Sequence, residues 1–335
     1  MSIQNREQLL RLIRDLHERI RDAVVAACEQ AAVEQLAGVA EDAADGDTIY
    51  AVDRVSEAVL LEFFAAAIAP HWPLVLIAEG LPDNGMLLPA GTPETATTIR
   101  VIVDPIDGTR GLMYQKRSGW ILTGVAPNRG PQTRLSDIEL AVMTEIPLVK
   151  QHLSDSLWAF SDGPLHGERF NRVSGETQPI HLRPSQAAGL AHGFATVSRF
   201  FPGIRSELAA IDDELAQQLL GPPQPGKAQC FEDQYICSAG QLYELIAGHD
   251  RFTADLRPLF IGKAGSPGIC SHPYDLATML LAQKAGVLLS DERGASLDAP
   301  LDLHSNVGWI GYANAGLRAQ IEPKLLAILR ARGLV

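Results

Sequence analysis

The sequence predicts a protein of the α/β class, built from α+β layers. Three observations support this class. Segments with helical spacing of apolar residues alternate with short β-branched runs along the chain, no period marks an internal repeat, and 46% of the 335 residues are hydrophobic. A chain of this size can bury two cores. We therefore expect an N-terminal α+β subdomain over residues 1–160 and a C-terminal α/β subdomain over 161–335.

The N-terminal half is predicted to begin with two helices and to continue as a sheet. Apolar residues recur at helical spacing from Leu9 to Cys28, which predicts an amphipathic helix over 5–36. A loop over 37–48 follows, and then a helix over 54–68 with Asp53 in it or just before it. Apolar runs on either side of a loop over 80–97 predict five strands, at 73–78, 98–103, 120–127, 138–146 and 153–160.

The C-terminal half begins with a polar, irregular stretch over 161–190, and Gly221-Pro-Pro-Gln-Pro-Gly226 reads as a loop. Short apolar runs predict four strands, at 179–183, 193–198, 287–290 and 308–312. Longer stretches predict four helices, at 203–219, 234–248, 273–285 and 315–332.

The net charge and the pattern of apolar residues limit the kinds of partner that we expect. A net charge of −12 argues against a nucleic acid polymer. No run of about 18 apolar residues or signal-peptide pattern is present, so we expect no membrane association and a cytoplasmic location. The four cysteines form no CxxC pair, which favours reduced thiols.

Residues 99–110 carry the strongest functional signal. An apolar run ends in Asp104 and Asp107, with Pro105 between them and Gly108-Thr109 after them. Two carboxylates this close repel each other, and a hard divalent cation such as Mg²⁺ would relieve the repulsion. The N–H groups of Gly108 and Thr109 would face an anion if a helix starts there. Taken alone, an Asp-Pro-x-Asp turn is more often a turn former or a helix cap.

Three other acidic residues stand at the ends of predicted elements. Asp53 lies at the start of a helix, Glu79 ends an apolar strand, and Asp275 opens an apolar helix, where it could also be a plain N-cap. Aspartyl-phosphate phosphatases of the haloacid dehalogenase type have a related motif, but with two aspartates that are two positions apart. Here the spacing is three, which would break that geometry and leaves this class as the weakest alternative.

Glu79, the block Asp104-Pro-Ile-Asp-Gly-Thr109, and Tyr274-Asp275-Leu-Ala-Thr278 followed by Ala285-Gly286 together resemble the inositol monophosphatase family. This family belongs to the lithium-sensitive, Mg²⁺-dependent sugar-phosphate phosphatases. The resemblance extends from Asp53 to about residue 313. It implies a layered αβαβα sandwich of the inositol monophosphatase or fructose-1,6-bisphosphatase type.

The resemblance also implies roles for individual residues. Glu79, Asp104 and the carbonyl of Ile106 would hold a first Mg²⁺, and Asp104, Asp107 and Asp275 a second, with Glu79 sharing a third. Thr109, helped by Asp53, would orient and deprotonate the attacking water, with Glu79 also in the catalytic set. The backbone of Gly108 and Thr109 would cradle the phosphate, and the substrate-binding set would also include Asp107 and Asp275.

A second segment resembles one branch of this superfamily. Thr196-Val-Ser198-Arg199 is similar to a stretch that lines the substrate site in phosphatases of 3′-phosphoadenosine 5′-phosphate, which would make Ser198 and Arg199 substrate ligands. A surface arginine at a strand end is the alternative. The chain departs from the family pattern at Gly80, at Arg110-Gly111-Leu112 and at Tyr274, and it carries extra length over 221–272.

We therefore expect a Mg²⁺-dependent phosphomonoesterase that hydrolyses a small polyol, sugar or nucleotide phosphate by direct attack of an activated water. A phosphatase of 3′-phosphoadenosine 5′-phosphate or fructose 1,6-bisphosphate, and a phosphate-ester-binding regulatory protein without turnover, are the alternatives. By resemblance, Li⁺ would inhibit and the protein would be a homodimer.

Overall fold

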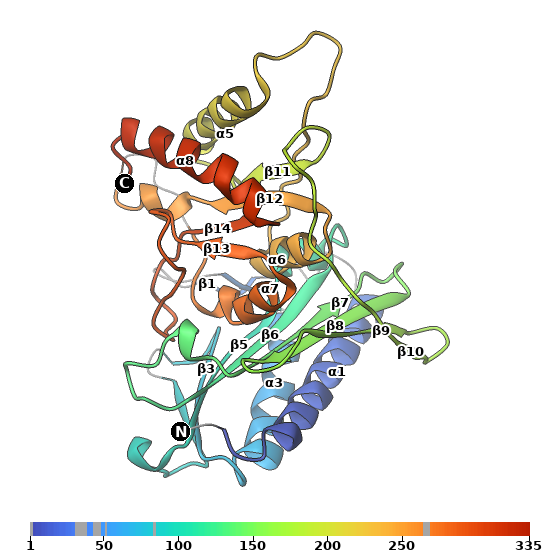
Figure 1. Ribbon diagram of the computed structural model, residues 1–335. Coiled ribbons are helices and arrows are strands. Elements are labelled where there is room, and N and C mark those ends of the chain that lie inside the picture. The colour runs from blue at the N-terminus through green and yellow to red at the C-terminus, as the bar shows by residue number, and fades with distance from the viewer. Residues whose placement is uncertain (1–2, 31–38, 43–47, 51, 83–84, 264–268) are drawn as a thin grey trace.

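The computed structural model describes residues 3–335 apart from 31–38, 43–47, 51, 83–84 and 264–268. Helices and sheets alternate in five layers (Figure 1). The order is a helical pair, an eight-stranded sheet, a second helical pair, a four-stranded sheet and a third helical pair. The predicted layered αβαβα sandwich is therefore confirmed.

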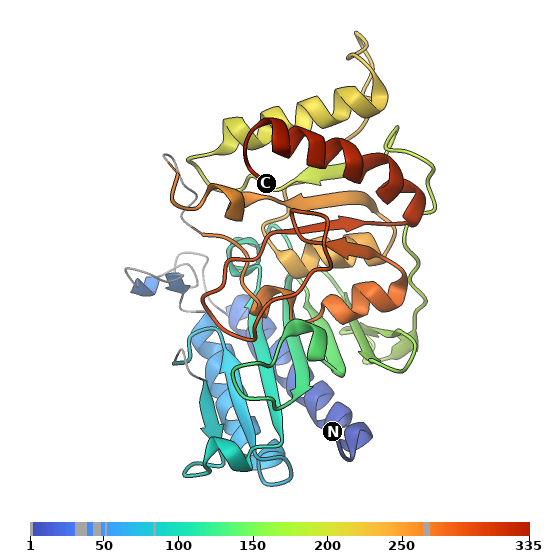
Figure 2. The ribbon, with the colours of Figure 1, turned by 60° about the vertical axis from the view of Figure 1, so that its left-hand side comes forward.

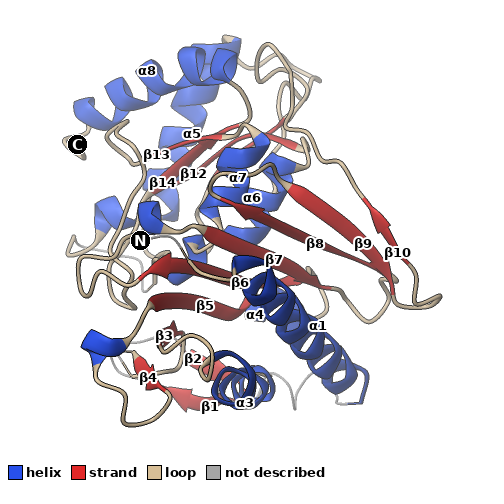
Figure 3. Cartoon of the chain, turned by 60° about the horizontal axis from the view of Figure 1, so that its bottom comes forward, coloured by secondary structure: helices blue, strands red, loops and turns tan. Residues whose placement is uncertain are grey.

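The first sheet has the strand order β10-β9-β8-β7-β6-β5-β3-β4. Neighbours are antiparallel except β3 and β5, which are parallel. The strands are β3 (Leu74–Ala78), β4 (Met86–Leu88), β5 (Ile99–Asp107), β6 (Gly119–Pro127), β7 (Leu140–Ile146), β8 (Leu153–Phe160), β9 (His166–Asn171) and β10 (Thr177–Pro179). Strands β3, β5 and β6 are buried along their whole length because helices cover both faces of the sheet (Figure 3).

One face of this sheet is covered by α1 (Arg6–Gln30) and α3 (Asp53–Phe63), which a π-helical turn extends to Ile68. The buried stripe of α1, which includes Leu9, Ile13 and Leu16, follows the predicted amphipathic spacing. A small antiparallel pair, β1 (Val39–Asp42) and β2 (Thr48–Tyr50), stands apart from both main sheets.

The second sheet has the order β11-β12-β14-β13, with β11 parallel to β12. Its strands are β11 (Phe194–Val197), β12 (Asp250–Asp255), β14 (Trp309–Tyr312) and β13 (Leu288–Ser290). Helices α6 (Ser238–Ile246) and α7 (Met279–Ala285) lie between the two sheets, while α5 (Arg205–Leu220) and α8 (Ala315–Ala331) cover the outer face (Figure 2). The chain passes from the first sheet to the second between Pro179 and Phe194. The expected boundary at residue 160 stays a prediction.

Several predicted elements have different bounds in the structure. The strand predicted over 98–103 continues to Asp107, because β5 keeps its pairing with β6 after a register shift. The helix predicted from 234 begins at Ser238, because the side chain of Gln234 instead bonds the backbone of Val197 and Arg199 beside the second sheet. The helix predicted over 273–285 is divided into a 3-10 turn, Tyr274–Leu276, and α7.

Some elements were missed altogether. The loop predicted over 80–97 contains β4 and a 3-10 turn, Glu94–Ala96, and the irregular stretch over 161–190 contains β9. The strand expected at 179–183 is wrong, because β10 covers Thr177–Pro179 and residues 180–183 form no strand. Strand β12 was not predicted, because Phe252 and Ala254 are the only apolar residues among its six. Part of the loop expected over 37–48 is β1 and the start of β2, and residues 31–36 of the first predicted helix lie outside the described residues.

No helix among the described residues is long and apolar enough to cross a bilayer.

Candidate metal and phosphate site

The site is built around the end of β5, where the strand is distorted. Asp104 lies opposite Leu122 of β6 and Asp107 opposite Trp120, so the register shifts between the two carboxylates. A bulge of this kind bends a strand and redirects its side chains. The N–H of Ile106 donates to Asp104 Oδ1 at 3.0 Å, which fixes the first carboxylate within the turn.

Gly108 closes the turn in a conformation that favours glycine. Its φ is 89°, in the left-handed region. A Cβ atom at this position would lie 3.0 Å from both Cβ and Sγ of Cys237, at the start of α6. The turn can therefore approach α6 closely only without a side chain at Gly108.

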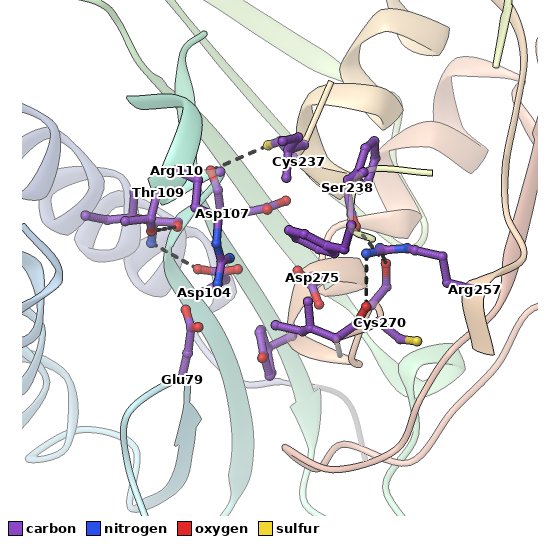
Figure 4. Close-up of a pocket in the computed structure, with 18 of the residues that line it drawn as sticks. Glu79, Asp104, Asp107, Thr109, Arg110, Cys237, Ser238, Arg257, Cys270 and Asp275 are labelled. Atoms are coloured by element: carbon purple, nitrogen blue, oxygen red, sulfur yellow. Dashed lines mark hydrogen bonds between the residues drawn. The ribbon is translucent and has the colours of Figure 1, made fainter. Parts of the chain in front are cut away.

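Three carboxylates meet in one pocket. Asp104, Asp107 and Asp275 each offer an oxygen atom, and these atoms all lie within 4.8 Å of one another (Figure 4). Glu79 lines the same pocket from the end of β3, whose last residue, Ala78, pairs with Val103 in the parallel register. Glu79 and Asp104 are the residues that follow this pair, so they lie next to each other at the same edge of the sheet, Glu79 just after β3 and Asp104 still within β5.

Asp275 reaches this pocket from the second half of the chain. It lies inside the 3-10 turn, where its Oδ2 accepts the N–H of His272 at 2.6 Å. The N-cap of α7 is Thr278, so the reading of Asp275 as a plain helix cap is wrong.

The clustered carboxylates raise one another's pKa. Burial raises the pKa of Asp104 well above its ordinary value, and the nearby charges of Glu79, Asp107 and Asp275 raise it further. Burial also raises the pKa of Asp107 to about 6, although the N–H of Ala239 and the charge of Arg257 act in the opposite direction. A bound cation would stabilise such a cluster, because its positive charge offsets the repulsion between the carboxylates.

The donor set fits a hard divalent cation. The converging ligands are carboxylate oxygens, the kind of ligand that Mg²⁺ prefers. The two thiols in the pocket, Cys237 and Cys270, are buried, and burial raises the pKa of each, that of Cys270 to about 12. Neither thiol belongs to the converging group of ligand atoms, which are all oxygens, and oxygen ligands favour a hard cation over a soft one.

Thr109 and Asp53 form a hydrogen-bonded pair at the edge of the pocket. The hydroxyl of Thr109 lies 2.9 Å from Asp53 Oδ1 and 2.8 Å from the carbonyl oxygen of Ile106, and its single hydrogen can go to either acceptor. Asp53 is the first residue of α3 and Thr109 the first of α4 (Thr109–Met113), so two helix starts hold this pair.

Two predicted substrate ligands do not line this pocket. Ser198 is fully buried and accepts a hydrogen bond from Gln241 Nε2 at 3.0 Å. Arg199 pairs with Asp212 at 3.2 Å and with Glu232, and it lines a neighbouring hollow that shares Phe200 and Ile236 with the pocket.

Sequence reasoning missed the wall opposite the carboxylates. Arg257, which follows β12, has its guanidinium 4.8 Å from the ring centroid of Phe200 and 5.6 Å from that of Phe201. Its Nε donates to Asp255 Oδ1 at 2.8 Å. The segment Asp255-Leu-Arg257-Pro after the short run Phe252-Thr-Ala254 was the available signal. Other missed residues of the lining are Arg110, Ile236, Cys237, Ser238, Ile269, Cys270, Ser271 and Tyr274.

Comparisons with known proteins place this fold. No protein-family model and no curated protein sequence matches the chain. Among solved structures, the chain is similar to fructose-1,6-bisphosphatase from Leishmania major in its holo form, with a TM-score of 0.67 and 14% identity over 96% of this chain and 94% of that one. It is also similar to the extragenic suppressor protein suhB from Bartonella henselae, with a TM-score of 0.62 and 15% identity over 95% of this chain and 98% of that one.

At these identities the likeness concerns the fold. The chain has the layered fold of the fructose-1,6-bisphosphatase and inositol monophosphatase type, as the sequence resemblance implied.

Proposed function

We propose that the protein is a Mg²⁺-dependent phosphomonoesterase that acts on a small phosphorylated metabolite, a polyol, sugar or nucleotide phosphate. The observation that carries the proposal is the convergence of Asp104, Asp107 and Asp275 within 4.8 Å in a pocket that Glu79 also lines. Shared folds host different functions, so the proposal rests on these side chains and their chemistry rather than on the fold.

The residues that would hold the cations are Glu79, Asp104, Asp107, Asp275 and the carbonyl of Ile106. Two or three Mg²⁺ ions bound there would supply charge stabilisation for the attacking and leaving oxygens of an in-line displacement. The remaining catalytic contribution is mainly the positioning of water and phosphate, because phosphoryl transfer needs little covalent help from the protein.

Thr109 and Asp53 supply a route for the proton of the attacking water. A water that donates to Thr109 Oγ1 can pass its proton there while the hydroxyl hydrogen of Thr109 moves to Asp53 Oδ1, 2.9 Å away. The oxygen of the water then bonds to phosphorus as the bond to the alcohol oxygen breaks. The leaving oxygen takes a proton from a second water, and Asp53 returns its proton to the solvent. The N–H groups of Gly108 and Thr109, at the start of α4, would receive the phosphate oxygens.

A second candidate is a phosphatase of a doubly anionic substrate, such as 3′-phosphoadenosine 5′-phosphate or fructose 1,6-bisphosphate. Arg110 and Arg257 both line the pocket, and their guanidinium groups lie 5.4 Å and 5.6 Å from the ring centroid of Phe201. Two cations beside an aromatic ring would suit a second anionic group or a flat base. A third candidate, a regulatory protein that binds phosphate esters without turnover, is distinguished by tight binding in calorimetry without phosphate release.

The test is phosphate release from a panel of inositol, fructose, histidinol and adenosine phosphates with and without Mg²⁺. We expect Asp104→Asn to lose activity by about 10³-fold, because several kcal/mol of charge stabilisation depend on this carboxylate. Near-wild-type activity in that variant would contradict the proposal. A covalent adduct on Asp104 with beryllofluoride would instead indicate an aspartyl-phosphate mechanism.

Three further properties belong to this proposal through the family resemblance. We expect Li⁺ to inhibit at the second cation position, the protein to be a homodimer, and its location to be cytoplasmic. Inhibition curves, sedimentation equilibrium and cell fractionation test them in turn.

A further inference from the structure

A chain of buried polar side chains forms part of the pocket wall opposite the carboxylates, and the proposed hydrolysis of a phosphate monoester gives it no chemical role. Its members are Ser238, Ser271, Asp255 and Arg257, each at least nine-tenths buried. Ser238 Oγ lies 3.0 Å from Ser271 Oγ, and Ser271 Oγ lies 2.8 Å from Asp255 Oδ2. Arg257 binds both oxygens of Asp255.

The chemistry of these groups fixes the direction of the chain. Asp255, paired with the guanidinium of Arg257, is a carboxylate that can only accept hydrogen bonds. The single hydroxyl hydrogen of Ser271 therefore goes to Asp255 Oδ2, and Ser271 Oγ must accept the hydrogen of Ser238. Because Asp255 pairs with Trp309 at the end of β12, the chain is anchored in the second sheet.

Each serine belongs to a segment that holds one of the clustered carboxylates. Ser238 precedes Ala239, whose N–H donates to Asp107 Oδ2 at 2.6 Å. Ser271 precedes His272, whose N–H donates to Asp275 Oδ2 at 2.6 Å. The Ser238–Ser271 bond thus joins the segment that holds Asp107 to the segment that holds Asp275.

We infer that the hydrogen-bonded chain Ser238–Ser271–Asp255–Arg257 is a positioning device that sets the separation of Asp107 and Asp275, and so the affinity for the cation that these two carboxylates share. The inference rests on the proposed cation site. Asp107 ends β5 of the first sheet, and Asp275 lies in a turn from the second half of the chain that packs against β5 and α6. Their spacing therefore depends on contacts between segments that are far apart in the sequence. Partners behind metal ligands commonly change metal affinity by about 10- to 100-fold when removed.

The test is Mn²⁺ binding to the full-length protein without substrate, measured from the electron paramagnetic resonance signal of free Mn²⁺. We expect Ser238→Ala and Ser271→Ala each to weaken Mn²⁺ binding by about 10-fold. The double variant should be no weaker than the poorer single variant, because both substitutions remove the same bond. Urea unfolding checks that each variant is folded at the assay temperature.

Ser154→Ala is the matched control. Ser154 is equally buried, and its hydroxyl makes one hydrogen bond, of 2.8 Å, to the carbonyl of Glu145 in the first sheet, outside the pocket. It should bind Mn²⁺ like the wild type despite a similar loss of stability.

The outcomes separate this inference from the proposed function. If the wild type binds Mn²⁺ and Asp104→Asn does not, while both serine variants bind like Ser154→Ala, the cation site stands and the positioning role is wrong. If the wild type binds no Mn²⁺, or Asp104→Asn binds it normally, the cation site and the positioning role both fail.

Discussion

The two sides of the pocket are built in different ways. In the turn over 104–109, hydrogen bonds join residues two or three positions apart, as between Ile106 and Asp104 or Thr109 and Ile106. On the opposite side, local bonds such as Arg257 to Asp255 occur together with bonds between distant segments, such as Ser238 to Ser271, which are 33 positions apart. From this side, Ala239 also donates to Asp107 of the turn, 132 positions away. The contrast teaches that the turn supplies the reactive groups, while the distant segments decide where those groups lie.

Thr109→Ala should give the largest effect and tests the turn side. Loss of the hydroxyl removes the proton route to Asp53, and we expect kcat to fall by about 10³-fold, a typical size for general acid–base catalysis. Thr109→Ser keeps the hydroxyl and should retain most of the activity. Equal losses of kcat in the two variants would show that the hydroxyl takes no part in the mechanism. Steady-state phosphate release with Mg²⁺ measures both.

Gly108→Ala tests the contact between the two sides. A left-handed φ costs an alanine about 1 kcal/mol, and overpacking against Cys237 adds about 1–3 kcal/mol. We therefore expect about 3 kcal/mol of lost unfolding free energy in urea denaturation. Gly130 has a φ of 62°, and a Cβ atom there would meet no other atom within 4 Å, so Gly130→Ala should show only the backbone cost. Equal losses of unfolding free energy in both variants would mean that the contact with Cys237 does not affect stability.

The pH dependence of the unfolding free energy tests the contacts of His17, a residue of α1, with the sheet that supports the turn. His17 lies fully buried between Thr144 and Thr123, 3.0 and 2.8 Å from their hydroxyls, on β7 and β6. Burial, reinforced by the charge of Arg14, lowers the pKa of His17 to about 3 from the ordinary 6.5. Because the folded state disfavours the proton, the stability is fully present above about pH 6.5 and is lost as the pH falls toward 3.

The expected loss from this histidine is about 2 kcal/mol of unfolding free energy between about pH 7 and pH 5. Urea denaturation at the two pH values measures it. His17→Gln should be less stable at neutral pH and show a shallower dependence, while the exposed His71 offers a control in His71→Gln. An unchanged slope in His17→Gln would contradict the assignment.

Ser198→Ala and Arg199→Met should give the smallest effects. Neither residue lines the carboxylate pocket, so we expect kcat/KM to change by no more than about twofold for a monophosphate substrate. A rise in KM of more than about tenfold in either variant would place that residue in the substrate site and weaken the contrast between the two sides.

The two sides of the pocket also differ in how well their residues could be predicted from the sequence. Asp104, Asp107, Thr109, Glu79 and Asp275 could be found because each stands at the end of an apolar element, where an acidic or hydroxyl side chain is informative. Asp255 and Arg257 could not be found, because in the sequence they look like two surface charges. Only the folded structure shows that they form a buried ion pair at the end of β12. The start of α6 at Ser238 was also hidden, because it depends on Cys237, whose Sγ accepts the N–H of Gly240 as the helix cap.

The layers themselves were easier to foresee than their edges. Long periodic stretches such as α1 gave reliable helices, and buried runs such as β5 gave reliable strands. Strands of three or four residues, including β4 and β13, depend on pairing with distant partners rather than on local pattern, and of these two only β13 was foreseen.

The bond between Ala239 and Asp107 also bears on how the protein folds. A contact across 132 positions adds to the contact order, and such contacts form after local ones have offset their loop-closure entropy. The cation pocket is therefore complete only once the two halves have docked. A divalent ion that links Asp107 to Asp275 would act on the unfolding rate more than on the folding rate, and would lengthen the lifetime of the native state.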